Sequence, residues 1–184
     1  MDALSKPELL AVLGAARRRP KYGERDFLMI LMAYEHGYRA SELVAITKDD
    51  IQEERIVTQR LKGSQYTKQS LHEDENPLLN ERAAVFAFIA KLRPKQRLFP
   101  VTRRTFGRIV ARHAKAAGLP ANKRKPHMLK HTMGAEIYNK SKDLRLVRMR
   151  LGHKRESSSL IYSGHIAEQV ADAEVEALLG SSGD

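Results

Sequence analysis

The sequence contains no cysteine and no long apolar run, and these two absences narrow the class of protein. Without cysteine the chain has neither a disulfide bond nor a thiolate metal site, which fits a cytoplasmic protein. The longest apolar run, from Phe27 to Tyr34, spans eight residues, whereas a membrane helix needs about 20. The first residues, Met1 to Lys6, carry no signal-peptide pattern. We therefore expect a cytoplasmic protein.

Acidic residues are missing from one long stretch. Between Arg82 and Ala135 there are 14 Lys or Arg and no Asp or Glu, in a chain whose net charge is +11. A block of this length is typical of a surface that faces a polyanion such as DNA. A solvated basic face is the alternative. A membrane surface is less favoured, because the block has no sustained apolar stripe with aromatic anchors.

The length of 184 residues suits one domain, and no internal boundary is marked. Ser5, Pro7 and Glu8 form a helix start with a capping box. β-branched residues after Arg55 predict a strand, and Lys62-Gly63-Ser64 predicts a hairpin turn into a second strand. Helices are expected at about 5–18, 25–36, 40–46, 78–92, 102–117, 127–139, 143–151 and 166–179. The predicted fold is mainly α with a small antiparallel β-sheet (α+β).

Six scattered residues carry the chemistry that the sequence indicates. They combine one phenol, three positive charges and two imidazoles, which suffice to attack a phosphodiester and to hold its extra charge. These candidates are Arg39, Lys62, His127, Lys130, His153 and Tyr162.

Tyr162 is the candidate nucleophile. A free tyrosine has a pKa near about 10, so neighbouring cations are needed to favour its phenolate. An isolated tyrosine is more often a core residue whose hydroxyl is satisfied, so the assignment depends on the other five residues.

Arg39 and Lys62 are candidates for binding phosphate and for donating a proton. Arg39 follows a glycine that ends a buried helix, and its planar guanidinium can grip two phosphate oxygens. Glu42, one turn later, could orient it, or the two could form a purely structural pair. Lys62 at a hairpin tip could protonate a leaving 5′ oxygen, or it could be an ordinary solvated lysine.

His127 and Lys130 share one face of a predicted first helical turn, where backbone amides favour an anion. His153 follows Leu151-Gly152 and begins the segment that leads to Tyr162. Imidazoles can donate hydrogen bonds to phosphate, although a lone histidine is commonly a core or capping residue. His127 and His131 have the spacing of a zinc pair, but no third ligand is obvious.

These residues resemble the tyrosine recombinase (phage integrase) family over nearly the whole chain. The family pattern Gly-x-Arg-x-Ser-Glu-Leu is met by Gly37 to Leu43, and a hairpin lysine follows about two dozen residues later. A His-x-x-Arg motif is met by His127 but carries Lys130 in the place of the arginine. Leu-Gly-His and a tyrosine nine residues beyond complete the pattern.

The resemblance implies roles for these residues. Tyr162 would form a 3′-phosphotyrosyl link, and Lys62 would protonate the 5′ oxygen. The scissile phosphate would be held by Arg39, His127, Lys130 and His153. No metal and no cofactor would be needed, because the tyrosyl ester stores the bond energy for religation. Lysine at position 130 keeps the charge but loses the bidentate fork, which implies slower cleavage.

Within the family the likeness is greatest to the short recombinases that invert fimbrial promoter switches. It rests on His36 to Leu43, on Arg60-Leu61-Lys62, on Pro77 to Asn80 and on Pro126 to Leu129. Residues 1–184 would then form one catalytic domain without a separate N-terminal DNA-clamping (core-binding) domain.

The resemblance also implies partners. Double-stranded DNA would be bound by a basic helix and by a basic loop, mostly through salt-dependent phosphate contacts. The predicted C-terminal helix, 166–179, would dock on a neighbouring protomer in a dimer or tetramer on DNA, or it would pack at home. Accessory DNA-bending proteins and a nucleoid-associated location would fit this activity. The expected DNA-binding residues are Arg103, Arg104, Thr105, Arg108, Lys123, Arg124 and Lys125.

Three other functions are compatible with the same residues. A DNA-binding regulator of the same fold would show little or no strand transfer. A type IB-like topoisomerase would use the same chemistry without site specificity. A His/Lys acid–base nuclease would release free ends and never retain DNA covalently.

Overall fold

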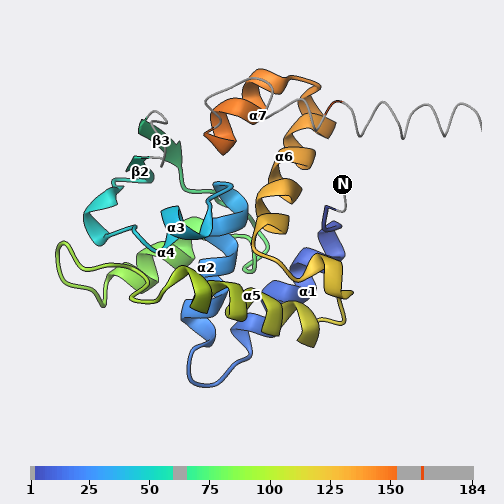
Figure 1. Cartoon of the computed structure of the whole chain (residues 1–184). Coiled ribbons are helices and arrows are strands. Elements are labelled where there is room, and N and C mark those ends of the chain that lie inside the picture. Colours follow the sequence, from blue (N-terminus) through green and yellow to red (C-terminus); the bar gives the residue numbers. More distant parts are fainter. Residues whose placement is uncertain (1–2, 60–65, 153–162, 164–184) are drawn as a thin grey trace, which may run out of the picture.

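The protein is mainly helical, with a small antiparallel sheet at one side (Figure 1). The computed structural model describes residues 3–59, 66–152 and 163. Its longer helices are α1 (Lys6–Arg17), α2 (Gly23–Glu35), α4 (Glu81–Ile89), α5 (Arg103–Ala116), α6 (His127–Ser141) and α7 (Leu144–Leu151). Shorter elements are α3 (Ala40–Leu43), the 3₁₀ turns η1 (Lys48–Asp50) and η2 (Ala121–Lys123), and the strands β1 (Ile51–Gln52), β2 (Arg55–Gln59) and β3 (Tyr66–Ser70). The expected fold class is confirmed.

Helix α1 begins with the capping box that the sequence predicts. The hydroxyl of Ser5 accepts from the backbone N–H of Glu8, and the Glu8 carboxylate accepts from the backbone N–H of Ser5. Both orphan donors are therefore satisfied without water. Leu9 and Leu13 lie on the buried face of the helix, which packs against α2 and α5.

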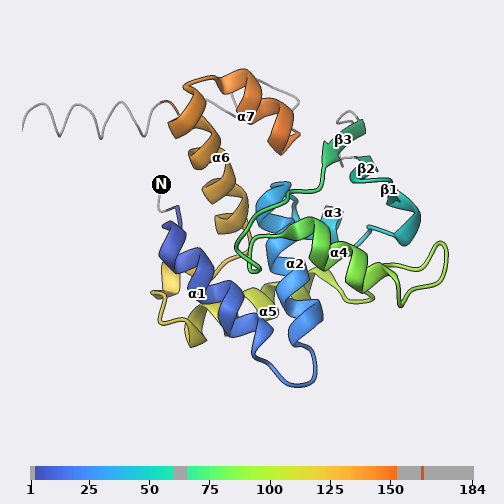
Figure 2. The ribbon, with the colours of Figure 1, turned by 180° about the vertical axis from the view of Figure 1, so that it is seen from behind.

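Helix α2 is the centre of the core, and α1, α4, α5 and α6 pack against it (Figures 1 and 2). Every residue from Asp26 to Glu35 is buried. A helix without a polar face gains stability only when neighbours surround it. Its C-terminal end, with Glu35 and His36, carries polar side chains into the buried region next to β3 and α7.

A buried carboxylate joins α2 to α5. Asp26 is fully buried and accepts hydrogen bonds from Arg19 and Arg25 and from the ring of His113. Burial alone would raise the pKa of Asp26, but the hydrogen bonds from His113, Arg25 and Arg19 outweigh it and lower that pKa. An unpaired buried carboxylate would be strongly destabilising, so these partners make its position tolerable.

The sheet has the order β1-β2-β3, and all its pairs are antiparallel. Thr58 pairs with Thr67, and Gln59 pairs with Tyr66, so the predicted hairpin is present up to its last described residues. Its turn, residues 60–65, lies outside the described residues. The two-residue strand β1 was not predicted, because so short a segment carries no periodic pattern. Helix α4 begins at Glu81, later than predicted, because Asn80 provides its N-cap.

Helix α6 leads away from the helical body to α7, which lies near β3 in both views (Figures 1 and 2). Lys142 follows α6 in the left-handed conformation, and Asp143 caps the start of α7. Gly152 ends α7 with a φ of 63°. The predicted helix at 166–179 lies outside the described residues. None of the helices described is long and apolar enough to cross a membrane.

Gly37 allows α7 to approach the end of α2. Its φ is +57°, and a Cβ at this position would lie 2.2 Å from Cδ2 of Leu151. The absence of a side chain therefore serves both the turn and the packing of α7.

Replacing Gly37 with alanine should destabilise the protein more than the same change at Gly118. Both glycines have positive φ, which costs an L-residue about 1–2 kcal/mol, but a Cβ at Gly118 would meet no atom within 4 Å. Gly37→Ala should lose about 1–3 kcal/mol more through displacement of Leu151. Chemical denaturation of both variants measures the difference, and equal losses would contradict the packing role of Gly37.

Candidate active site

Arg39 lies immediately before α3, and a buried carboxylate fixes its orientation. Glu42 accepts from the backbone N–H of Arg39 at 2.8 Å and from its guanidinium at 2.9 Å. The Glu42 side chain is 2% exposed, whereas that of Arg39 is 46% exposed. The contact expected from the sequence is therefore present, and it presents a charged, preoriented guanidinium to solvent.

The end of the β2–β3 pair that lies next to residues 60–65 is tied to Tyr38, the residue before Arg39. The hydroxyl of Tyr38 lies 3.2 Å from that of Thr58 on β2, which in turn lies 3.2 Å from the hydroxyl of Thr67 on β3. Both strands lead into residues 60–65, which include Lys62. These contacts fix the last described residues of β2 and β3 relative to the turn before Arg39.

Helix α6 supplies His127 and Lys130. His127 is exposed in the first turn, and its ring meets that of His131 edge-on, with centroids 5.5 Å apart. Burial, together with the positive charge of His127 and Lys130, lowers the pKa of His131. No group of three potential metal ligands occurs among the residues described.

Lys130 is 9% exposed, and its ammonium donates to the carbonyl oxygen of Leu151 at 2.8 Å. The preceding carbonyl, that of Arg150, accepts from the side-chain amide of Gln69 on β3, also at 2.8 Å. The side chain of Leu151 packs on Gly37. The last residues of α7 are thus held at once by α6, by β3 and by the turn before Arg39.

Lys62, His153 and Tyr162 lie outside the described residues, and their roles stay predictions. For the other three candidates the described part gives a partial answer. Gly37, in the turn before Arg39, and the ammonium of Lys130 both contact Leu151 at the end of α7, two residues before His153. His127 lies one helical turn before Lys130.

The predicted DNA-binding helix is α5. Arg103, Arg104 and Arg108 are exposed on it, which leaves them available to phosphates. Thr105 has a structural function as well, because its backbone N–H donates to the hydroxyl of Thr102, the N-cap. DNA binding by these residues stays a prediction.

The predicted DNA-binding loop is partly engaged within the protein. The ammonium of Lys123 contacts both carboxylate oxygens of Glu8, and Nε of Arg124 donates to the carbonyl of Leu119. Lys125 is exposed. Phosphate contacts by Lys123 and Arg124 would therefore compete with existing partners, whereas Lys125 is exposed to solvent and open to such a contact.

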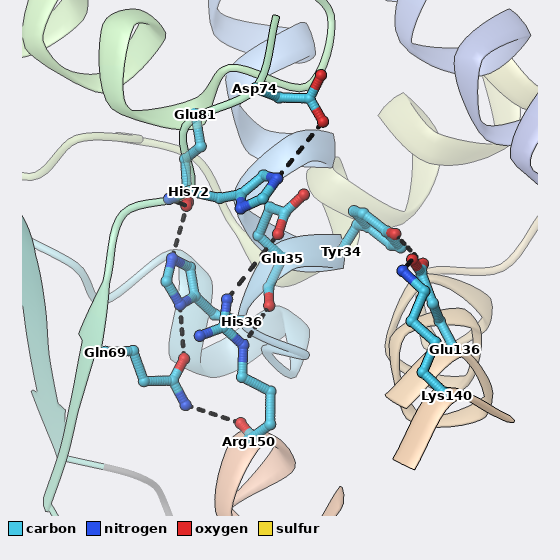
Figure 3. A network of polar contacts seen from close by, with 10 residues as sticks. All are labelled: Tyr34, Glu35, His36, Gln69, His72, Asp74, Glu81, Glu136, Lys140 and Arg150. Atoms are coloured by element: carbon cyan, nitrogen blue, oxygen red, sulfur yellow. Dashed lines mark hydrogen bonds and ion pairs between the residues drawn. The ribbon is translucent and has the colours of Figure 1, made fainter. Parts of the chain in front are cut away.

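A buried polar network beside these residues was missed in the sequence (Figure 3). The ring of His36 lies between the carboxylate of Glu81 at 2.8 Å and the amide oxygen of Gln69 at 2.6 Å. Arg150 donates from Nε to the carbonyl of Glu35. The only signal in the sequence was a Glu-His pair at the end of an otherwise apolar helix.

Comparisons with known proteins agree with this geometry. The sequence matches the model of the Phage integrase family over residues 3–169. The chain belongs to the phage integrase family. Its likeness extends to named relatives and to solved structures.

Two similar relatives are both called tyrosine recombinase XerD. The protein of Pseudomonas putida is 30% identical over 179 residues, and that of Vibrio cholerae is 28% identical over the same length. Each match covers 90% of this chain but only 58% and 57% of the relatives. The chain thus spans somewhat more than half the length of these members of the integrase family.

Solved structures support the fold. A post-cleavage complex of the XerH site-specific recombinase with palindromic difH substrate has a TM-score of 0.75 at 22% identity, and covers 95% of this chain and 52% of that one. The lambda integrase catalytic core has a TM-score of 0.66 at 20% identity, and covers 84% of this chain and 93% of that one. The integrase fold therefore extends over most of the described residues.

Glu35, at the end of α2, is a buried acid near the candidate site. Burial raises the pKa of its carboxyl to about 8, and the negative charges of Glu81 and Glu136 act in the same direction. Arg150 and Lys6 act in the opposite direction. The nearest guanidinium nitrogen of Arg150 is 3.9 Å away, too far for a hydrogen bond, so it offsets burial only in part.

Glu35 should make the folded protein less stable as pH rises from about 4.5 to about 8. In this window the folded state keeps a proton on Glu35 that the unfolded state releases, so the free energy of unfolding falls with pH. The slope from this group is at most about 1.4 kcal/mol per pH unit. Glu35→Gln should remove it and should be more stable than the parent at the alkaline end. Denaturation across the pH range tests this; parallel profiles for the two proteins would refute it.

Proposed function

We propose that this integrase-family protein cleaves and rejoins DNA at a specific site through a 3′-phosphotyrosyl intermediate. The main observation behind this proposal is that three elements meet at Leu151. Lys130 on α6 donates to the carbonyl of Leu151. The side chain of Leu151 packs on Gly37, two residues before Arg39. The names of relatives add support, since they are tyrosine recombinases and site-specific recombinases.

The proposed reaction is an exchange of one ester for another. The phenol of Tyr162 gives its proton to water, its oxygen attacks the scissile phosphorus, and the bond from phosphorus to the 5′ oxygen breaks. The electron pair stays on that oxygen, which takes a proton from Lys62. Arg39, His127, Lys130 and His153 stabilise the added negative charge. Attack of a 5′ hydroxyl on the phosphotyrosyl ester reverses these steps and rejoins a strand.

The partners of this reaction are proposals as well. Exposed arginines of α5 supply phosphate contacts to double-stranded DNA. One similar structure is a lambda integrase dimer bound to a core site, which supports self-association on DNA. Docking through residues 166–179, accessory DNA-bending proteins, a nucleoid location and kinship with the fimbrial inverting recombinases stay predictions.

A Tyr162→Phe variant should lose covalent DNA attachment entirely, because phenylalanine has no nucleophilic oxygen. First, DNA that is covalently bound to the protein in cells is recovered and sequenced. The site found in this way is then placed in a nicked suicide substrate, on which formation of the covalent adduct is measured. Tyr22→Phe is the matched control, since Tyr22 lies in the turn between α1 and α2. It should form the adduct at the parent rate.

The same assay separates the other functions. An adduct that forms equally on unrelated sequences, with plasmid relaxation, would indicate a topoisomerase. Free ends without an adduct would indicate a nuclease. DNA binding without cleavage, in parent and Tyr162→Phe alike, would indicate a regulator.

The regulator is the second candidate, because Lys130 is largely buried and bound to a backbone carbonyl.

If the protein is a recombinase, Lys130→Arg should speed suicide-substrate cleavage. Arginine has five donors in a planar fork, so it can keep the Leu151 carbonyl and still bind phosphate. A regained charge-assisted hydrogen bond of about 1.5–3 kcal/mol corresponds to about a ten- to two-hundredfold gain. Cleavage no faster than the parent's would refute this account of position 130.

A further inference from the structure

A chain of buried hydrogen bonds runs from α4 through α2 and β3 to α7 (Figure 3). It begins at Glu81, passes through the ring of His36 and the side-chain amide of Gln69, and ends on the carbonyl of Arg150. His36 and Glu81 are fully buried, and Gln69 is 9% exposed. A second oxygen of Glu81 accepts from the backbone N–H of His72.

The orientation of Gln69 follows from donor and acceptor chemistry. The carbonyl of Arg150 can only accept, so the NH₂ group of Gln69 must face it, and the amide oxygen of Gln69 then faces Nδ1 of His36. Nδ1 must therefore donate, and Nε2 lies within hydrogen-bonding distance of the carboxylate of Glu81. Because the nitrogen and the oxygen of the Gln69 amide each have a partner, the amide has one allowed orientation.

This chain connects two segments that the proposed reaction needs. β3 directly follows residues 60–65, which include Lys62, and Gln69 lies on β3. Arg150 lies three residues before His153. Since the last carbonyls of a helix have no partner within it, an outside donor fixes where the chain leaves α7.

We propose that Gln69 is a positioning residue, which fixes the end of α7, the helix that leads to His153, relative to strand β3, the strand that follows Lys62 in the chain. Lys130, on α6, donates to the next carbonyl, that of Leu151, so two donors from different elements together fix the last residues of α7. Gln69 itself touches no DNA in this proposal. The catalytic part of the inference rests on the proposed function.

Gln69→Leu tests the proposal, with Gln52→Leu as the matched control on exposed strand β1. Gln69→Leu removes the donor to Arg150 and should slow formation of the covalent adduct about 10- to 100-fold, as a small misplacement of reacting groups does. Its affinity for the same DNA should equal the parent's. The control should match the parent in both.

Hydrogen exchange supplies a readout that is independent of cleavage. In Gln69→Leu the peptide that covers residues 144–152 should lose protection selectively, while α1 and α5 keep theirs. A merely structural role would instead lower protection throughout the core. In Gln52→Leu the protection of 144–152 should not change.

Gln69→Glu supplies a second variant, which keeps the acceptor for His36. As a carboxylate it turns a negative oxygen toward the Arg150 carbonyl; as a neutral acid it can donate there, as glutamine does. Its adduct rate relative to the parent's should therefore rise as pH falls. The charged and titratable groups near this position are His36 at the end of α2, Glu81 on α4 and Arg150 on α7. The carboxylate of Glu81 favours the neutral form of the new acid, whereas the guanidinium of Arg150 favours its carboxylate.

The outcomes separate this proposal from the function on which it rests. A parent that forms no adduct on any recovered site refutes the recombinase function, and hydrogen exchange then decides on the link alone. A parent that forms the adduct, with Gln69→Leu equally fast, refutes the positioning role. Unchanged protection of residues 144–152 in Gln69→Leu refutes the link itself.

Discussion

The end of α7 is the constraint on which the site depends. Two consecutive carbonyls, those of Arg150 and Leu151, accept hydrogen bonds from Gln69 and Lys130, and the leucine side chain packs on Gly37. Each donor comes from a different element, so none of these elements can shift alone without breaking a buried contact. A short helix of eight residues, which has little stability of its own, thereby acquires a fixed place.

The polar groups around this point are tolerable only because they are fully paired. Burying an amide, an imidazole and carboxylates is costly unless each finds a partner. Among the residues described, no buried side-chain nitrogen or oxygen lacks one. Glu35 shows that burying a carboxyl group is still unfavourable here, since burial favours its neutral form. The buried acid thus lowers the stability of the folded protein next to the candidate site. In return, the hydrogen-bond network there allows few alternative arrangements and fixes the local geometry.

Local signals predicted much of the fold, and long-range partners were beyond them. The capping box at Ser5, the buried apolar helix before Gly37 and the β-branched strand after Arg55 depend on neighbours within a few residues, and each was found. The motifs around Arg39 and His127 identified the family by residue type and spacing. His36, however, meets partners 33 and 45 residues away, and the Lys130 contact spans 21 residues. Such pairs depend on tertiary packing, which leaves no helical or strand periodicity in a single sequence.

The contact of Lys130 gives the departure from the family arginine a physical meaning. An ammonium is a compact group with three donors, whereas a guanidinium spreads five over a plane. At this position the amine is largely buried and serves the carbonyl of Leu151, so a phosphate that approaches must share it with the backbone. In the proposed reaction, binding of the phosphate and support of the end of α7 would then be coupled through one atom. If a DNA phosphate drew the ammonium of Lys130 away from the carbonyl of Leu151, the end of α7 would lose one of its two donors. The side-chain amide of Gln69 would then be the remaining donor of the two, through the carbonyl of Arg150.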